Sequence, residues 1–365
     1  MPDRNILEEF MKLLNQPGPV NWALATQLAD HLSGPAEPLD PWLAEEYLEL
    51  ARYARLRFTQ ATGVMSDPMA EAVLVDRKGW TQHNLQSFSY IAEPLAAKLT
   101  GSASPGPLDA VLRQLGPALL GMQVGAMVGM MSEGALGLFD AGLPTAEPSG
   151  IVFLVPNIET FASESGLDHR QVRLWSALHE VVHDALAGHA WVRPYVVGLF
   201  KELSASVELD PETLSGWQEE LADPAKLEAR LSQGGGFPAL FGGPLQEDRL
   251  DDIRRFITVM DGYGSYLVEC ASAGLLPELG SIRNAMSSRR RDHRGQALLG
   301  GMFRLETTAG THGPAAAFCT EVEERWGDAA VRRVWERPEN LPLSEELNDV
   351  TGWAARVLLD DPFTV

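Results

Sequence analysis

The sequence predicts a mainly α-helical protein of the α+β class with a small β-sheet. Apolar residues recur every three or four positions in many segments, the spacing that gives a helix one apolar face. The segments with this pattern are 5–15, 20–33, 40–58, about 84–99, 192–206, 211–221, 224–232 and about 247–273. Pro- and Gly-bearing turns at 17–19 and 34–41 separate the first three. The short apolar segment 151–155, closed by Pro156 and Asn157, predicts a strand.

A further helix is predicted from about His169 to Ala187. Asp168 is a favourable N-cap residue, and Gln171 stands three positions later, which is the spacing of a capping box. Gly188 follows the last apolar residues, and we expect it to end the helix in the left-handed conformation.

This helix contains the motif His-Glu-Val-Val-His at residues 179–183. Two histidines four positions apart project from the same side of a helix, and their imidazole nitrogens can bind one metal ion at about 2 Å each. Glu180 lies next to the helix face that carries the two histidines, where it can take a proton from a zinc-bound water. The spacing therefore predicts a catalytic zinc with His179 and His183 as ligands and Glu180 as the general base.

The residues around the motif place both histidines on the buried side of the helix. A stripe at helical spacing is formed by Val172, Trp175, His179, Val182, His183 and Leu186. Two histidines buried one turn apart beside a glutamate cost free energy unless a metal ion or hydrogen bonds satisfy them. Two hydrogen-bonded core histidines are the competing interpretation.

A tetrahedral catalytic zinc usually has a third protein ligand, and His189 is one candidate. It follows His183 by six residues, as the third histidine does in the pattern HExxHxxGxxH. The glycine that turns the chain in that pattern belongs at position 186, where this chain has Leu186.

Asp261 is the other candidate for the third ligand. It is the one carboxylate on the apolar stripe of the helix predicted at about 247–273. Gly262 and Gly264 lie beside it and would let this helix pack closely against the metal-binding helix. A carboxylate that caps a helix or pairs with an arginine is the alternative.

The segment 116–131 is almost wholly apolar but is shorter than the roughly 18 residues of a membrane span. Gly121, Gly125 and Gly129 fall on one helix face, a pattern that lets another backbone approach closely. We therefore expect a buried helix and no membrane association.

Composition limits the partners and the location. The chain has 365 residues, 45% of them hydrophobic and 22% charged, as in soluble globular proteins. Its net charge of −21 disfavours nucleic acid and anionic lipid as partners. The basic run 289–294 is interpreted as a solvated helix end or loop. Cys270 and Cys319 form no CxxC pair, and no apolar signal segment stands at the N-terminus, so we expect a cytoplasmic protein.

Several segments together resemble a family of bacterial zincin-like metallopeptidases, whose members are often labelled hydrolases or proteins associated with the biosynthesis of a deazaflavin coenzyme. The segments that carry the resemblance are Arg77 and Trp80, 136–140 (LGLFD), 155–157 (VPN), 174–183 (LWSALHEVVH), 260–263 (MDGY) and 341–342 (LP). The resemblance covers roughly residues 65–358 and implies a zincin-like fold. It also implies that Asp261 is the third ligand, because the family has a Glu-Gly pair where this chain has Asp-Gly. The family has Pro-Trp where this chain has Ala190-Trp191.

We therefore expect an N-terminal helical extension at 1–64 and a zincin-like metallohydrolase domain at 65–365, or one continuous domain. The predicted activity is zinc-dependent hydrolysis, most simply of a peptide bond, with a peptide or small amide as substrate. A small amide or ester hydrolase and a zinc-bound scaffold without turnover are the alternatives.

Two further segments could contribute to substrate binding. The strand at 151–155 could align an extended peptide by strand addition, or it could be an ordinary core strand. The Gly-rich loop 234–244 could act as a lid over the site or be a simple connector.

Overall fold

The structure is a computed structural model that describes residues 18–35, 37–64, 72–101, 107–140, 142–146, 150–206, 247–292 and 312–359. The helices predicted at 5–15, 211–221 and 224–232 and the loop 234–244 lie outside the described residues.

The mainly α fold with a small sheet is confirmed. The helices are α2 (Trp22–Leu32), α3 (Pro41–Thr62), α4 (Arg77–Leu85), α5 (Ser89–Gly101), α6 (Pro107–Gly134), α7 (Val155–Ser165), α8 (His169–Ala187), α9 (Val192–Ser206), α12 (Glu247–Ser272), α13 (Leu279–Asp292), α15 (His312–Trp326), α16 (Asp328–Arg333) and α17 (Val350–Leu358). The strands are β1 (Ala72–Val75) and β2 (Ile151–Leu154), and three 3-10 helices are η1 (Gln86–Phe88), η3 (Pro338–Asn340) and η4 (Glu346–Asn348).

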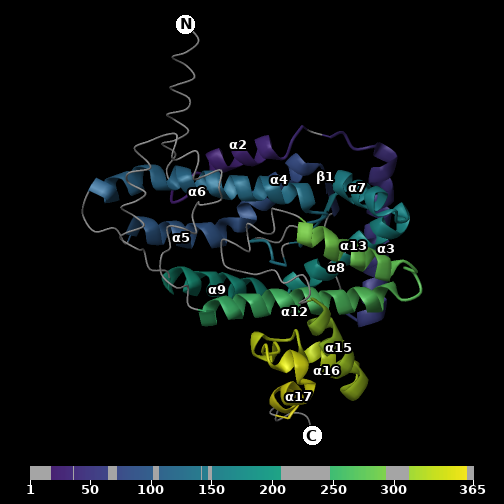
Figure 1. The fold of residues 1–365 in the computed structure, drawn as a ribbon. Coiled ribbons are helices and arrows are strands. Elements are labelled where there is room, and N and C mark those ends of the chain that lie inside the picture. Colours follow the sequence, from purple (N-terminus) through teal and green to yellow (C-terminus); the bar gives the residue numbers. More distant parts are fainter. Residues whose placement is uncertain are drawn as a thin grey trace.

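Helix α8 packs against both α3 and α12, while α2 lies at one side of the molecule and α15–α17 at the other (Figure 1). The predicted N-cap of α8 is confirmed, because the Asp168 carboxylate accepts the N–H of Gln171 at 2.9 Å. The apolar core contains residues from Val20 to Val357. The division into domains at 64/65 stays a prediction.

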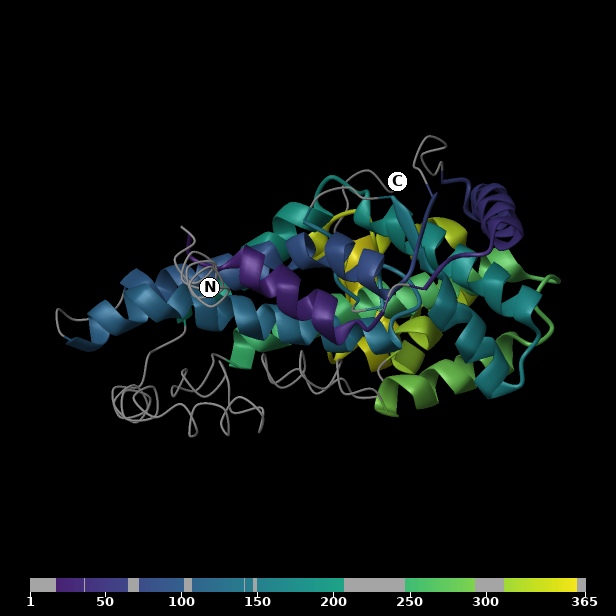
Figure 2. The same ribbon diagram turned by 90° about the horizontal axis from the view of Figure 1, so that it is seen from above.

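The glycine face of the apolar segment packs against another helix, as the sequence predicts. Seen from above, α2 lies along α6 (Figure 2). A Cβ added at Gly121 or Gly125 would overlap with the backbone of α2, and one at Gly129 would lie 2.7 Å from the Cβ of Leu32. Among the described residues, no helix is long and apolar enough to span a bilayer.

Strand β2 is a core strand, and the interpretation of 151–155 as a peptide-aligning edge strand is wrong. Its residues are fully buried. One edge pairs in parallel with β1, from Ala72 with Ile151 to Val75 with Leu154. On the other edge, Leu154 donates its N–H to the carbonyl oxygen of Leu136 at 2.9 Å, and Gly137 bridges Phe153. Described residues of the chain therefore occupy one edge of β2 along its length and the other edge at Phe153 and Leu154.

The predicted strand also ends one residue early, because Val155 begins α7. Pro156 lies in the first turn of that helix, where the missing N–H of proline costs nothing. A proline after an apolar segment can mark either a turn or the start of a helix, so the sequence did not distinguish the two.

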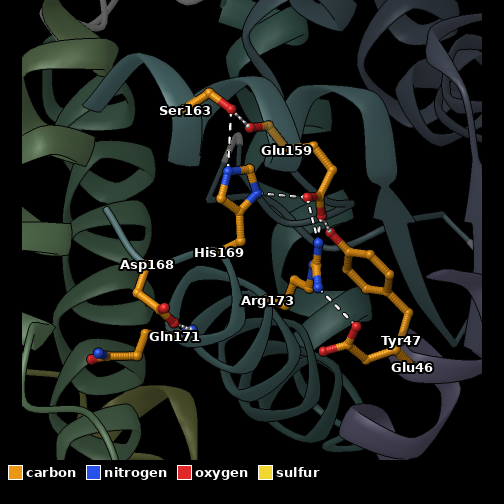
Figure 3. A network of polar contacts seen from close by, with 8 residues as sticks. All are labelled: Glu46, Tyr47, Glu159, Ser163, Asp168, His169, Gln171 and Arg173. Carbon is orange, nitrogen blue, oxygen red and sulfur yellow. Dashed lines mark hydrogen bonds and ion pairs between the residues drawn. The ribbon is translucent and has the colours of Figure 1, made fainter. Parts of the chain in front are cut away.

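A partly buried polar network joins α3, α7 and α8 (Figure 3). Glu159 of α7 accepts hydrogen bonds from the Tyr47 hydroxyl at 2.8 Å and from Arg173 at 2.8 and 2.7 Å. Its carboxylate also lies 2.7 Å from Nδ1 of His169, and Arg173 reaches Glu46 of α3 at 2.8 Å. The network joins the first two turns of α8, through His169 and Arg173, to the helices beside it.

Candidate metal centre

His179 and His183 lie on the buried face of α8, as the stripe predicts. They are 7% and 0% exposed, and their ring centroids are 4.1 Å apart. Nδ1 of His183 lies 2.8 Å from the carbonyl oxygen of His179. Because a carbonyl oxygen can only accept, Nδ1 carries the proton and the lone pair of the neutral ring is on Nε2. Burial, followed by the neighbouring His179, lowers the pKa of His183 and so favours this neutral ring.

Asp261 of α12 approaches the same point from the neighbouring helix. Its Oδ1 lies 3.7 Å from Nε2 of His183, and the carboxylate is buried. One ligand atom each from His179, His183 and Asp261 lie within 4.8 Å of one another. Gly264 makes this approach possible, because a Cβ there would lie 2.6 Å from Nε2 of His183.

This set of residues fits a zinc ion. Nε2 of His183 is buried and has no hydrogen-bond partner among the described residues, although a carboxylate oxygen lies 3.7 Å away. A lone pair and a carboxylate repel one another in a buried site unless a cation lies between them. The separation is too long for a hydrogen bond, whereas two atoms that each bind one ion at about 2 Å can lie this far apart. Two imidazoles and one carboxylate also leave a fourth position for a water.

Glu180 lies beside this cluster and is 2% exposed. Its Oε2 accepts the N–H of Leu138 at 3.0 Å, while Oε1 lies 3.5 Å from Nδ1 of His179. Oε1 makes no hydrogen bond within the described part of the chain. Burial, with a smaller contribution from Asp140, raises the pKa of Glu180 to about 8. A divalent cation close by would favour the carboxylate and lower that pKa.

The segment 136–140 positions Glu180. A Cβ on Gly137 would overlap with Oε1 of Glu180, so only glycine lets the carboxylate lie here. The Oδ2 atom of Asp140 accepts the N–H groups of Leu136 at 2.5 Å and Gly137 at 2.8 Å. Trp80 donates its indole N–H to the carbonyl oxygen of Gly137 at 2.7 Å. These bonds orient the Leu138 N–H that Glu180 accepts.

Asn157 fastens the start of that segment to the end of α6. Its Nδ2 donates to the carbonyl oxygens of Ser132 and Ala135 at 2.8 and 2.7 Å. Its Oδ1 accepts from Nε of Arg77 at 2.8 Å. Sequence reasoning missed the positioning roles of these residues. A signal for these roles was present in the sequence, because the segments that carry the family resemblance include residues 77, 80, 136–140 and 155–157.

His189 lies outside the cluster. Among the described residues, the group that could hold a metal consists of His179, His183 and Asp261. Helix α8 ends at Ala187 as predicted, but the expected left-handed Gly188 is wrong, because this residue has φ −70°. The N–H of Gly188 bonds to Asp184 as in a continuing helix, and His189 then accepts the N–H of Val192 at 3.0 Å as α9 begins. The chain thus turns directly into α9 without a left-handed residue.

A cavity of about 220 Å³ lies against the outer side of the cluster. His179 and Trp175 of α8 line it, together with residues of α12, α13 and α15. His179 is therefore the cluster residue that borders open space, while the other two ligand candidates lie deeper.

Comparison with known proteins agrees with this geometry. The sequence profile of a family described as zincin-like metallopeptidases matches residues 20–354. The chain belongs to this family. The family assignment indicates a metal-dependent hydrolase with zinc as the metal. No curated protein sequence matches the chain significantly.

A solved structure supports the fold. The crystal structure of a proposed hydrolase with a novel fold from Chloroflexus aurantiacus aligns with a TM-score of 0.63 at 24% sequence identity. The alignment covers 94% of this chain and 99% of the other. At this identity the similarity concerns the fold alone.

Proposed function

We propose that this protein is a zinc-dependent peptidase in which His179, His183 and Asp261 hold the metal and Glu180 is the general base. The observation that carries the proposal is the buried Nε2 of His183, which has a lone pair, a carboxylate oxygen 3.7 Å away and no hydrogen-bond partner within the described residues. A cation at this point satisfies both groups. Glu180 lies beside it with one carboxylate oxygen held by Leu138 and the other not hydrogen-bonded within that part of the chain.

The chemistry follows from the residue types. Zinc, when bound, polarises the scissile carbonyl and makes a water more acidic. Oε1 of Glu180 takes a proton from the attacking water and then delivers it to the leaving nitrogen. Oε2 stays hydrogen-bonded to the Leu138 N–H, which keeps the carboxylate in place during both transfers.

Two alternatives differ in turnover or substrate. Burial of Glu180 at 2% exposure favours a zinc-bound scaffold without turnover, because a base needs contact with water. The cavity that borders His179 favours an enzyme, because a ligand can reach the metal-binding side of α8. The same zinc chemistry would also cleave a small amide or ester.

The decisive experiment is Glu180→Gln in the full-length chain. Glutamine keeps the shape and the hydrogen bond from Leu138 but cannot take a proton. We expect about one zinc per chain in both proteins by elemental analysis, and loss of at least about a hundredfold in cleavage of a peptide library by the variant. Amide and ester substrates are assayed in parallel.

The outcomes separate the hypotheses. Zinc-loaded wild-type protein that cleaves none of the substrates supports the scaffold. Cleavage of small amides or esters alone supports the small amide or ester hydrolase. Equal turnover by the wild type and Glu180→Gln rules out the general base, and a protein that binds no zinc under any condition rules out the proposal.

A further inference from the structure

The cavity beside His179 has a distinct electrostatic character. Its walls come from α8, α12, α13 and α15, and they include the apolar side chains Trp175, Val268 and Met286 and the hydroxyl of Ser287. Among the described residues that line it, Arg283 of α13 is the one Lys, Arg, Asp or Glu side chain. The wall of the cavity therefore carries one guanidinium group, in a chain whose net charge is −21.

Arg283 has donors available for a ligand. Nη1 pairs with Glu269 at 3.0 Å and Nη2 donates to the carbonyl oxygen of Ser265 at 3.1 Å. A guanidinium has five N–H donors, so these contacts within the described residues leave others unused. The Glu269 side chain is 60% exposed, and such ion pairs contribute little stability because water competes for both groups. A ligand carboxylate can exchange with Glu269 or bind beside it.

The cavity suits a short part of a chain. Its volume of about 220 Å³ is below the roughly 300–1,000 Å³ of sites for drug-sized ligands. A group that enters the cavity beside His179 therefore has its next few atoms among Trp175, Met286 and Arg283.

We propose that Arg283 binds a carboxylate of the substrate, so that the enzyme prefers peptides with a carboxylate on the residue next to the scissile bond. This inference rests on the proposed zinc peptidase. A planar guanidinium binds a carboxylate through two parallel hydrogen bonds, which sets the orientation of the substrate as well as its affinity. The carboxylate is either the C-terminus of the peptide or an acidic side chain, and the two are chemically equivalent for Arg283.

The first experiment measures binding to the zinc-loaded, full-length protein by calorimetry. The probes are the monohydroxamate of succinic acid, the same compound with its carboxylate converted to an amide, and acetohydroxamate. We expect the carboxylate compound to bind about 10- to 100-fold more tightly than its amide. Arg283→Gln should remove that preference and leave zinc content and acetohydroxamate binding unchanged, while Arg283→Lys should retain part of it.

Arg254→Gln is the matched control. Arg254 also lies on a helix surface and pairs with two carboxylates, Glu247 at 3.3 Å and Asp251 at 2.8 Å, but it does not line the cavity. This variant should keep the full preference. Equal affinity of wild-type protein for the carboxylate and the amide compound, or an unchanged preference in Arg283→Gln, overturns the inference but leaves the zinc peptidase intact.

The second experiment identifies the source of the carboxylate. Two peptides of one sequence end in a free carboxylate or in an amide, and a third differs from the amide peptide only by glutamate as its last residue. Preferential cleavage of the first assigns the C-terminus, and preferential cleavage of the third assigns an acidic side chain. Equal cleavage of all three overturns the inference. If acetohydroxamate fails to bind and no peptide is cleaved, the proposed function fails and the inference fails with it.

Discussion

His183 is the most constrained side chain of the metal centre. Its Nδ1 is used by the carbonyl oxygen of His179, and its Nε2 is enclosed between Asp261 and the bare Cα of Gly264. The first contact selects the tautomer that exposes a lone pair, and the second sets the distance to the carboxylate. Contacts within α8 and with α12 thus place His183 where the proposed metal ligand is needed.

The third ligand can be tested by comparing Asp261→Ala with His189→Ala. Asp261 is part of the buried cluster, while His189 is half-buried beyond the end of α8. Loss of a residue that merely supports a ligand costs about 10- to 100-fold in metal affinity, so loss of a ligand should cost at least about 100-fold. We expect competition with a zinc chelator to show that loss for Asp261→Ala and almost none for His189→Ala. The reverse order would assign His189 as the ligand.

Gly137 should be essential for activity but not for zinc binding. A Cβ there overlaps with Oε1 of Glu180, and the three atoms nearest to it all belong to Glu180. Gly137→Ala should displace the base and reduce turnover by about a hundredfold, with zinc content retained. Elemental analysis and the peptide assay measure the two effects. The control is Gly198→Ala on α9, where a Cβ meets nothing within 4 Å. Full activity in Gly137→Ala would show that Glu180 does not need its observed position.

At the scale of helices, Glu159 connects three elements whose relative positions set the site. Burial alone would raise the pKa of Glu159, but hydrogen bonds from Arg173, His169 and Tyr47 outweigh it and lower the pKa below its ordinary value of 4.5. A lowered carboxyl pKa means that the folded state binds the proton less well than the unfolded state does. The network therefore stabilises the fold above about pH 4.5, and this contribution is lost as the pH falls through the lowered pKa.

Glu159→Gln should lower the free energy of unfolding at pH 7 by about 1–2 kcal/mol, at the low end for charged hydrogen bonds because water partly screens the site. The difference from the wild type should shrink as the pH falls below 4.5. Urea unfolding at a series of pH values measures it. Glu164→Gln, an exposed position on the same helix, is the control and should change little. If the difference in the free energy of unfolding were the same at all pH values, the shape of the Glu159 side chain and not its charge would account for the stabilisation.

At the scale of the whole molecule, the metal centre lies where three segments far apart in the chain meet. Helix α8 supplies the histidines, α12 supplies Asp261, and 136–140 holds Glu180. The core around them is continuous, from α2 on one side to α17 on the other. Each of these segments is held in place by packing against other parts of the core, so the geometry of the site depends on the entire fold.

The sequence by itself determined the features that depend on local spacing. The HExxH spacing, the Asp168 cap and the apolar stripe predicted the bounds of α8 and the burial of both histidines, because helix periodicity is a property of neighbouring residues. The small-residue spacing at Gly121, Gly125 and Gly129 likewise predicted a close helix contact, though not its partner. The helix pattern made Asp261 one of two candidates for the third ligand, and the family resemblance favoured it over His189.

Only the tertiary structure decided the features that depend on distant contacts. Whether 151–155 is an edge or a core strand depends on β1 and on Leu136, which are separated from it along the chain. The role of Gly137 arises because its missing side chain leaves room for a carboxylate 43 positions later in the sequence. Arg283 borders the cavity only because α13 lies beside α12, where Arg283 contacts Ser265 and Glu269. Periodicity shows which side of an element is buried, but not which element covers it, because many arrangements bury the same apolar faces and only the packed chain selects one.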